Sequence, residues 1–212
     1  RGDKMLTHEQ LWGLASKNQP CKEPTTGTEY SVTRYDDTIV IAFESTRDAL
    51  DWKQNFSFWV RPYKHQDYIW LVHSGFRAKW KSVESDIQAR IEDILRVHRI
   101  TSIQVTGHSQ GGAIAFLCHE FCKYWYSNMT IETVTFGAPR VLCALFSKNI
   151  LTSGRFCGIV NYQIWDDIVV HLPPKWLGYI DVGVVTILQE HIPLFERVRR
   201  LHCSYGELLR RL

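Results

Sequence analysis

The stretch QVTGHSQGG, residues 104–112, places Ser109 between two glycines directly after an apolar run. The pattern Gly-x-Ser-x-Gly is weak evidence alone, because three fixed positions of common residues recur by chance. Here the residues before it predict a strand, and apolar residues at spacings of three and four after it predict a helix. A serine on such a strand-to-helix turn is placed for nucleophilic attack, and the helix N-terminus directs backbone N–H groups toward a developing oxyanion.

A serine nucleophile needs a base, and the base needs an orienting acid, in the chain order serine, acid, histidine for this architecture. The segment WDDIVVHLPP offers two acids, Asp166 and Asp167, directly after the apolar run CGIVNYQI. Carboxyl ends of parallel strands are where such sheets place their chemistry. The residues alone therefore predict an acid in this segment and leave the choice between the two open.

Three of the nine histidines follow these acids, namely His171, His191 and His202. His171 lies only four residues after Asp167, too near to move independently, and we expect it to be a loop or surface residue. His191 has no supporting pattern. His202 opens HCSYGELL after a charged turn and is the favoured base.

The elements that must position these residues follow from apolar periodicity. YSVTRYDDTIVIAF predicts an antiparallel hairpin, and the segment from Ser82 to His98 predicts an amphipathic helix. YIWLVHSGF, TSIQVT, IETVTFGAP and CGIVNYQIW predict strands that end at glycine, proline or an acid. Strands that alternate with helices predict an α/β architecture, with a mainly parallel central sheet and helices on both faces. Without a linker or repeat, we expect one domain over residues 1–212.

Composition narrows the function class. The net charge is +3, and the basic residues of ERVRRLHCSYGELLRR alternate with apolar ones, so we expect no nucleic-acid partner. The six cysteines fit no paired zinc spacing, and Cys118 and Cys122, one helical turn apart, are predicted to be unbridged. No apolar run is long enough for a transmembrane segment. Sequons at Asn55 and Asn128 permit secretion, which we favour over a cytoplasmic location.

Several segments, read together, resemble the class 3 lipases, the fungal-lipase-like α/β hydrolases. VTGHSQGGAIA is similar to the nucleophile segment of that family, VTFGAPRV to its following strand and loop, and VHSGF to an earlier strand end. DIVVHLPP resembles its acid loop, HCSY its His-x-x-Tyr element, and AFESTRDALDWKQNFSF its oxyanion and lid segment. The matches occur in the family's order from about residue 30 to residue 205. The resemblance implies an α/β-hydrolase fold.

The resemblance also assigns roles. It implies that Ser109 is the nucleophile, His202 the general acid and base, and Asp167, rather than its neighbour, the residue that orients the imidazole. It implies an oxyanion hole formed by the hydroxyl and backbone N–H of Thr46 and the backbone N–H of Gln110. Members of the family need no metal or cofactor, and we expect neither here.

This chain departs from the family pattern at two places. Glu44 and Ser45 stand where relatives commonly have Arg-Gly before the oxyanion threonine, which replaces a cation by an anion. Asp181 stands where relatives often have a histidine, although that histidine is not the catalytic one.

A lid is the sharper of two interpretations of the segment after the oxyanion threonine. Its apolar residues are Leu50, Trp52, Phe56 and Trp59, with charged residues between them. Such a segment is either ordinary core packing or a lid over the acyl groove that turns outward at a lipid surface. The lid predicts peripheral contact with lipid surfaces.

The sequence thus predicts a serine carboxylic ester hydrolase that acts on lipid esters, with acylglycerol as the first substrate expectation. A phospholipid ester at the sn-1 position and a feruloyl-type ester are the alternatives. A hypothesis of another class is a noncatalytic lipid-binding protein on a hydrolase scaffold, motivated by the departure at Glu44 and Ser45.

Overall fold

The computed structural model describes residues 5–44, 58–65, 67–188 and 205–210. Within these residues, the larger sheet has seven strands in the order β1-β2-β3-β6-β7-β9-β11. They are β1 (Cys21–Lys22), β2 (Glu29–Tyr35), β3 (Thr38–Phe43), β6 (Ser102–His108), β7 (Thr130–Phe136), β9 (Ile159–Ile164) and β11 (Val184–Leu188). From β3 to β11 all neighbouring strands are parallel. At the other end, β1 pairs antiparallel with β2, and β2 pairs antiparallel with β3. The predicted parallel sheet with an N-terminal hairpin is confirmed.

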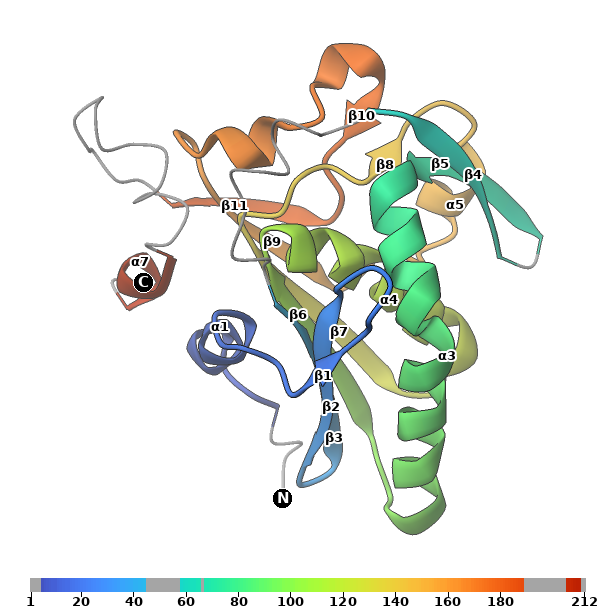
Figure 1. Cartoon of the computed structure of the whole chain (residues 1–212), viewed down its shortest axis with the longest axis vertical. Helices are drawn as coiled ribbons and strands as arrows, with labels where there is room; N and C mark the ends of the chain where they lie inside the picture. Colours follow the sequence, from blue (N-terminus) through green and yellow to red (C-terminus); the bar gives the residue numbers. More distant parts are fainter. Residues whose placement is uncertain (1–4, 45–57, 66, 189–204, 211–212) are drawn as a thin grey trace.

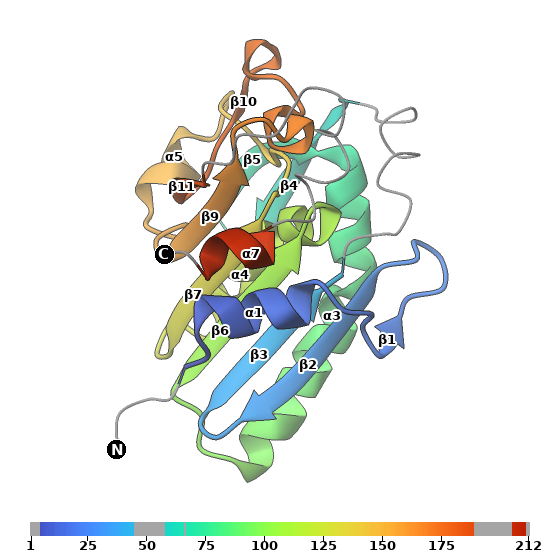
Figure 2. The same cartoon turned by 90° about the vertical axis from the view of Figure 1, so that its left-hand side faces the viewer.

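Helices cover both faces of this sheet, also as predicted. Figure 1 shows α3 (Ser74–Val97) and α4 (Gln110–Trp125) on one side, and α1 (His8–Ala15) and α7 (Tyr205–Leu209) on the other. In Figure 2, α1 and α7 lie side by side across their face of the sheet. Every residue of β3 and β6 is buried, which is the pattern of strands covered on both faces. No described helix is long and apolar enough to span a membrane.

Helix α3 begins eight residues before the start that the periodicity predicts. Its buried residues continue backward from Val83 to Trp80 and Phe76 at spacings of three and four. The side chain of His73 caps the new start, because its Nδ1 accepts the N–H groups of Gly75 and Phe76. The preceding strand therefore stops at His73.

A smaller antiparallel sheet, in the order β10-β8-β5-β4, lies beside the first. Its strands are β4 (Val60–His65), β5 (Tyr68–His73), β8 (Leu142–Cys143) and β10 (Tyr179–Ile180). The sequence predicts a strand at β5 but not this sheet, since two of its members are only two residues long. The remaining elements are α5 (Lys148–Thr152) and the 3-10 turns η1 (Ile168–His171) and η2 (Lys175–Leu177).

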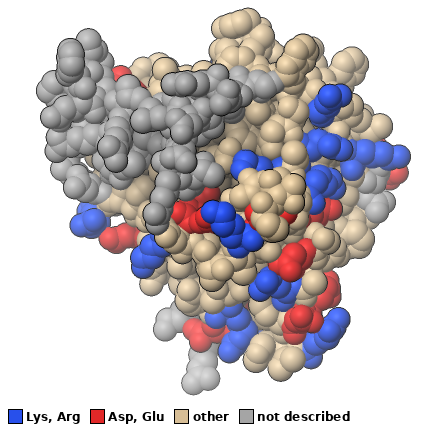
Figure 3. All heavy atoms as spheres, in the orientation of Figure 1, with Lys and Arg blue, Asp and Glu red and all other residues tan. Residues whose placement is uncertain are grey.

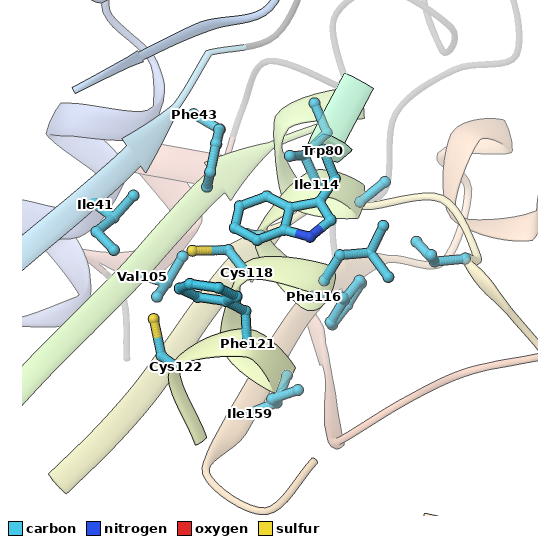
Figure 4. Packing of buried hydrophobic residues seen from close by; sticks show 14 of the residues in the cluster. Ile41, Phe43, Trp80, Val105, Ile114, Phe116, Cys118, Phe121, Cys122 and Ile159 are labelled. Atoms are coloured by element: carbon cyan, nitrogen blue, oxygen red, sulfur yellow. The ribbon is translucent and has the colours of Figure 1, made fainter. Parts of the chain in front are cut away.

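The largest core lies between the seven-stranded sheet and helices α3 and α4. In Figure 4 the indole of Trp80 lies at its centre, with its ring centroid 6.5 Å from Phe43 and 5.5 Å from Phe121. Cys118 and Cys122 of α4 are buried here as free thiols, so the prediction that they are unbridged is confirmed. At the surface, Figure 3 shows basic and acidic side chains interspersed over the described part of one face, as the small net charge leads one to expect.

Candidate active site

The turn between β6 and α4 holds Ser109 in a backbone conformation that favours glycine, with φ 53° and ψ −124°. Two glycines permit the turn through close backbone approaches. A Cβ on Gly107 would lie 2.3 Å from the carbonyl oxygen of Gly111, and a Cβ on Gly111 would lie 2.5 Å from that of Phe43. Such strain costs about 1–3 kcal/mol and persists where the surrounding structure enforces it. The strand, turn and helix that the Gly-x-Ser-x-Gly interpretation requires are all present.

The side chain of Ser109 is fully buried at the N-terminus of α4. Its backbone N–H donates to the carbonyl of Phe136 at 2.9 Å, and no described residue hydrogen-bonds to its Oγ. The first bond within the helix runs from the N–H of Ala113 to the carbonyl of Ser109. The N–H of Gln110 precedes that bond, at the end of the helix where the dipole favours negative charge.

Asp167 follows strand β9 and is also fully buried. Its Oδ1 accepts the N–H of Val169 at 2.9 Å, and its Oδ2 accepts a hydrogen bond from the hydroxyl of Tyr205 at 3.2 Å. The same hydroxyl oxygen accepts the N–H of Ile164 at 3.1 Å. Burial and the nearby carboxylate raise the pKa of Tyr205 well above its ordinary value, so the phenol stays protonated and remains a donor.

Gly137 joins the serine and the acid. Its φ is 59°, and a Cβ there would lie 3.1 Å from Oδ2 of Asp167 and 2.9 Å from the hydroxyl of Tyr205. The residue before it, Phe136, accepts the N–H of Ser109. Strand β7 therefore ends between the two predicted catalytic residues, at the carboxyl edge of the parallel strands. The sequence predicts a strand end here but assigns no role to this glycine.

Four aromatic rings pack together next to the serine and the acid, on the face of the sheet that α1 and α7 cover. Trp12 of α1 lies with its ring centroid 5.2 Å from those of His108 and Phe136 and 5.7 Å from that of Tyr205. Helices α1 and α7 thus contact residues that adjoin the site: His108, which precedes Ser109, and Tyr205, which bonds to Asp167. The sequence offers no periodic signal for this contact, because its members come from four separate elements.

The other predicted site residues divide into two groups. Those outside the described residues are Thr46, Leu50, Trp52, Phe56, His191 and His202. Trp59 is described: it precedes β4, its carbonyl accepts the N–H of Ser74 at 2.8 Å, and the residue is 76% exposed. The ring of His171 is bound to its own loop, since its Nε2 lies 2.6 Å from the carbonyl oxygen of Trp165.

Of the residues that depart from the family pattern, Ser45 lies outside the described residues, and Glu44 and Asp181 have structural partners. The carboxylate of Glu44 accepts the backbone N–H of Gln19 at 2.9 Å. Asp181 forms ion pairs with Arg140 at 2.9 Å and Lys175 at 2.8 Å. Burial opposes ionisation of Asp181, but the Lys175 hydrogen bond and the Arg140 charge hold its pKa below the ordinary value.

Arg140 is a residue whose role the sequence does not predict. Its guanidinium donates to the carbonyls of His171 and Pro173, and the backbone N–H of Arg140 donates to the carbonyl of Leu172 at 2.7 Å. These bonds fix the far end of the loop that begins with Asp167. The segment VTFGAPRV contains the only sequence signal for it, as part of the resemblance rather than as a separate pattern.

Among the described residues, no group of three or more His, Cys, Asp or Glu side chains is placed to hold a metal ion. His119, between the two helical cysteines, is bound within the fold instead. Its Nδ1 lies 2.8 Å from the hydroxyl of Thr133 and its Nε2 lies 3.1 Å from the carbonyl of Cys157. Burial lowers its pKa to about 3.

Comparisons with known proteins identify the family and the fold. A family model described as lipase (class 3) matches residues 40–176. A lipase of Rhizomucor miehei is 30% identical over 150 residues, which cover 69% of this chain and 40% of that relative. A secreted mono- and diacylglycerol lipase 3 of Gibberella zeae is 29% identical over 121 residues, covering 55% of this chain and 37% of that relative. The chain thus spans less than half the length of these relatives.

A solved structure of a triacylglycerol lipase, described as having a serine protease triad as its catalytic centre, also matches the fold. It is 25% identical, has a TM-score of 0.70, and is matched over 79% of this chain and 64% of its own. The mainly parallel sheet with helices on both faces is therefore the α/β-hydrolase fold of the fungal lipases.

Proposed function

Because the chain belongs to the class 3 lipase family, we propose that it hydrolyses carboxylic esters of lipids with Ser109 as the nucleophile. The observation that carries the proposal is the conformation of Ser109. A serine held at φ 53° between a buried strand and the N-terminus of a helix is strained in a way that a passive turn residue would not need to be.

The proposed mechanism passes through an acyl-enzyme. Ser109 Oγ attacks the ester carbonyl while His202 takes its proton, and His202 then gives that proton to the leaving alcohol. Water repeats the sequence, which releases the carboxylic acid and restores the serine. Asp167 holds the imidazole in the correct tautomer and stabilises its positive charge.

The proposed oxyanion hole consists of the hydroxyl and N–H of Thr46 and the N–H of Gln110. A preorganised donor of this kind lowers the barrier by about 3–4 kcal/mol. The support for Gln110 is its place as the first residue of α4. The carboxylate of Glu44, two residues before Thr46 in the sequence, accepts the backbone N–H of Gln19.

Acylglycerol is the proposed substrate class. One similar protein is named a mono- and diacylglycerol lipase and another a triacylglycerol lipase. Phospholipid at the sn-1 position and feruloyl-type esters are the remaining alternatives. We also propose a secreted location, because the Gibberella zeae relative is named as secreted.

A lid over the acyl groove, with contact to lipid surfaces, is part of the proposal. Trp59, at the end of the predicted lid segment, exposes most of its indole, as a lipid-contacting residue would. Serine substitutions at Trp52 and Phe56 should spare hydrolysis of soluble short-chain esters and weaken hydrolysis of emulsified acylglycerol. Equal losses on both substrates would contradict a lid and favour core packing.

The decisive experiment is labelling with a fluorophosphonate probe, combined with hydrolysis of p-nitrophenyl esters from acetate to palmitate. The unmodified protein should be labelled and active, and Ser109→Ala should be neither. Ser147→Ala removes a buried hydroxyl that is bound to the carbonyl of Cys143, and serves as the matched control that keeps both properties. A folded, unmodified protein that resists the probe and cleaves no ester would overturn the proposal in favour of a noncatalytic lipid-binding protein.

Triacylglycerol and phospholipid emulsions, assayed beside this panel, distinguish the substrate classes.

A further inference from the structure

A groove of about 480 Å³ lies between the β4–β5 hairpin and the segment that leads into α5. These elements are neighbours in Figure 1, and α5 packs on β5. The volume is within the usual range of small-molecule sites, about 300–1,000 Å³. None of the residues that line the groove belongs to the site around Ser109.

The floor of the groove is an apolar strip on the outer face of the hairpin. Ile69 and Leu71 are two residues apart on β5 and therefore share a face, and Pro62 of β4 lies directly opposite Leu71. Their neighbours Tyr63 and Trp70 point inward and are fully buried. Ile69 remains 57% exposed, so this strip presents hydrocarbon to solvent.

The charged groups at the groove have one sign. Lys148, the first residue of α5, lines its wall, and Lys64 shares the outer face of the hairpin because it pairs with Ile69. Neither lysine forms an ion pair with any described residue, and no carboxylate is among the lining residues. The groove therefore combines an apolar floor with positive charge that no described carboxylate neutralises.

Phe146 forms the lip of the groove in a strained conformation. It is the third residue of the turn closed by the N–H of Ser147 and the carbonyl of Ala144, and its φ is 59°. This turn position favours glycine or asparagine, and a bulky residue there is an outlier. Phe146 is 83% exposed, so burial in the core does not explain the conformation. Strain of this kind is typical of residues that clamp a ligand.

We propose that this groove binds a long-chain fatty carboxylate, with its hydrocarbon along Pro62, Ile69, Leu71 and Phe146 and its carboxylate at Lys148. The apolar floor suits an alkyl chain, and the two lysines, which form no ion pair within the described part of the chain, favour an anionic head group over a cationic or neutral one. The ligand belongs to the class that the proposed ester hydrolysis releases, so its source rests on the proposed function. Binding itself does not require Ser109.

The test uses the Ser109→Ala chain, labelled at isoleucine methyl groups, titrated with dodecanoate below the concentration at which it forms micelles. The Ile69 methyl resonance should shift with saturation. That of Ile187, an exposed isoleucine on β11 at the edge of the larger sheet and outside the groove lining, should not. Dodecyltrimethylammonium has the same chain with a cationic head and should bind at least about tenfold more weakly. Equal binding of the two, or equal shifts at both isoleucines, would overturn the proposal.

Two variants assign the parts of the groove. Lys148→Glu should weaken dodecanoate binding by about tenfold or more, because it reverses the charge that faces the carboxylate. Phe146→Asn should also weaken it, while the urea midpoint of unfolding stays equal or rises, because asparagine tolerates the turn geometry. If both variants bind dodecanoate as tightly as the Ser109→Ala chain does, the groove is not the site.

The outcomes separate this proposal from the proposed function. If the unmodified protein hydrolyses esters but dodecanoate does not shift the Ile69 methyl resonance, only the fatty-carboxylate site is contradicted. A saturable shift at Ile69 in a protein that hydrolyses no ester sinks the enzyme proposal alone.

Discussion

The phenol of Tyr205 donates a hydrogen bond to Oδ2 of Asp167 across 3.2 Å, and both side chains are fully buried. Through this bond, helix α7 fixes one oxygen of the carboxylate, while the N–H of Val169 fixes the other. Each carboxylate oxygen of Asp167 is therefore held in place by a described hydrogen-bond donor. We therefore predict that Tyr205 is a positioning residue for the proposed triad, which acts through Asp167.

Tyr205→Phe removes this bond and leaves the N–H of Ile164 without its acceptor. We expect a loss of about 1–3 kcal/mol in the free energy of unfolding and a fall of about tenfold in kcat, with KM little changed. Urea unfolding and steady-state hydrolysis of a soluble ester measure the two effects. Tyr126→Phe removes a phenol bound to Glu92, away from the site, and should cost stability without lowering kcat. Equal falls in kcat for both variants would contradict the positioning role.

Gly137→Ala should damage the site more than the backbone alone explains. The new Cβ would crowd Asp167 and Tyr205, so we expect both lower stability and a lower kcat. Gly154→Ala is the matched control, because its φ is also positive, at 77°, but its nearest neighbour is the Cys157 sulfur at 3.9 Å. Both variants carry a backbone strain of about 1–3 kcal/mol. Only the first should lose activity, and comparable activity in the two would show that Asp167 tolerates displacement.

Ser109→Gly and Ser109→Ala both remove the hydroxyl, but they differ in the backbone. Glycine adopts a φ of 53° without the steric cost that alanine retains. We expect the glycine variant to be about 1 kcal/mol or more stable than the alanine variant, although both should be inactive. Chemical denaturation of the two proteins under identical conditions measures the difference. A glycine variant that is no more stable would mean that the turn stores no strain.

His119 should make the folded state sensitive to acid. Burial lowers its pKa to about 3, whereas the imidazole of an unfolded chain titrates near its ordinary value of 6.5. Between about pH 3 and pH 6.5 the unfolded chain binds a proton at this histidine that the folded chain does not bind. The contribution of His119 to the free energy of unfolding is therefore complete above pH 6.5. It is lost as the pH falls toward 3, by about 1.4 kcal/mol per pH unit.

Urea unfolding between pH 7 and pH 4 tests this expectation. His119→Gln should flatten the dependence of the free energy of unfolding on pH, because an amide does not titrate. His98→Gln, at an exposed histidine after α3, should leave the dependence as steep as before. Parallel curves for the His119 variant and the unmodified protein would assign the acid sensitivity to other groups.

The sequence by itself determined the elements whose cause is local. The hairpin β2–β3, the parallel strands and the turn at Ser109 follow from apolar periodicity and from glycines at fixed spacing, which act within a few residues. The order serine, acid, histidine is also a property of the chain. The choice of Asp167 over Asp166 came from the resemblance, and the structure shows Asp167 fully buried and hydrogen-bonded. The roles of His202 and Thr46 stay predictions.

Only the tertiary structure decided which distant groups meet. Gly137 touches Asp167 and Tyr205 because β7 lies between β6 and β9 in the sheet, an order that strand-forming patterns do not encode. The smaller sheet escaped prediction because its two-residue strands carry no periodicity. The bond between Tyr205 and Asp167 spans 38 residues of sequence. Such a contact depends on how α7 docks beside α1, and docking follows from the packing of whole faces rather than from any local pattern.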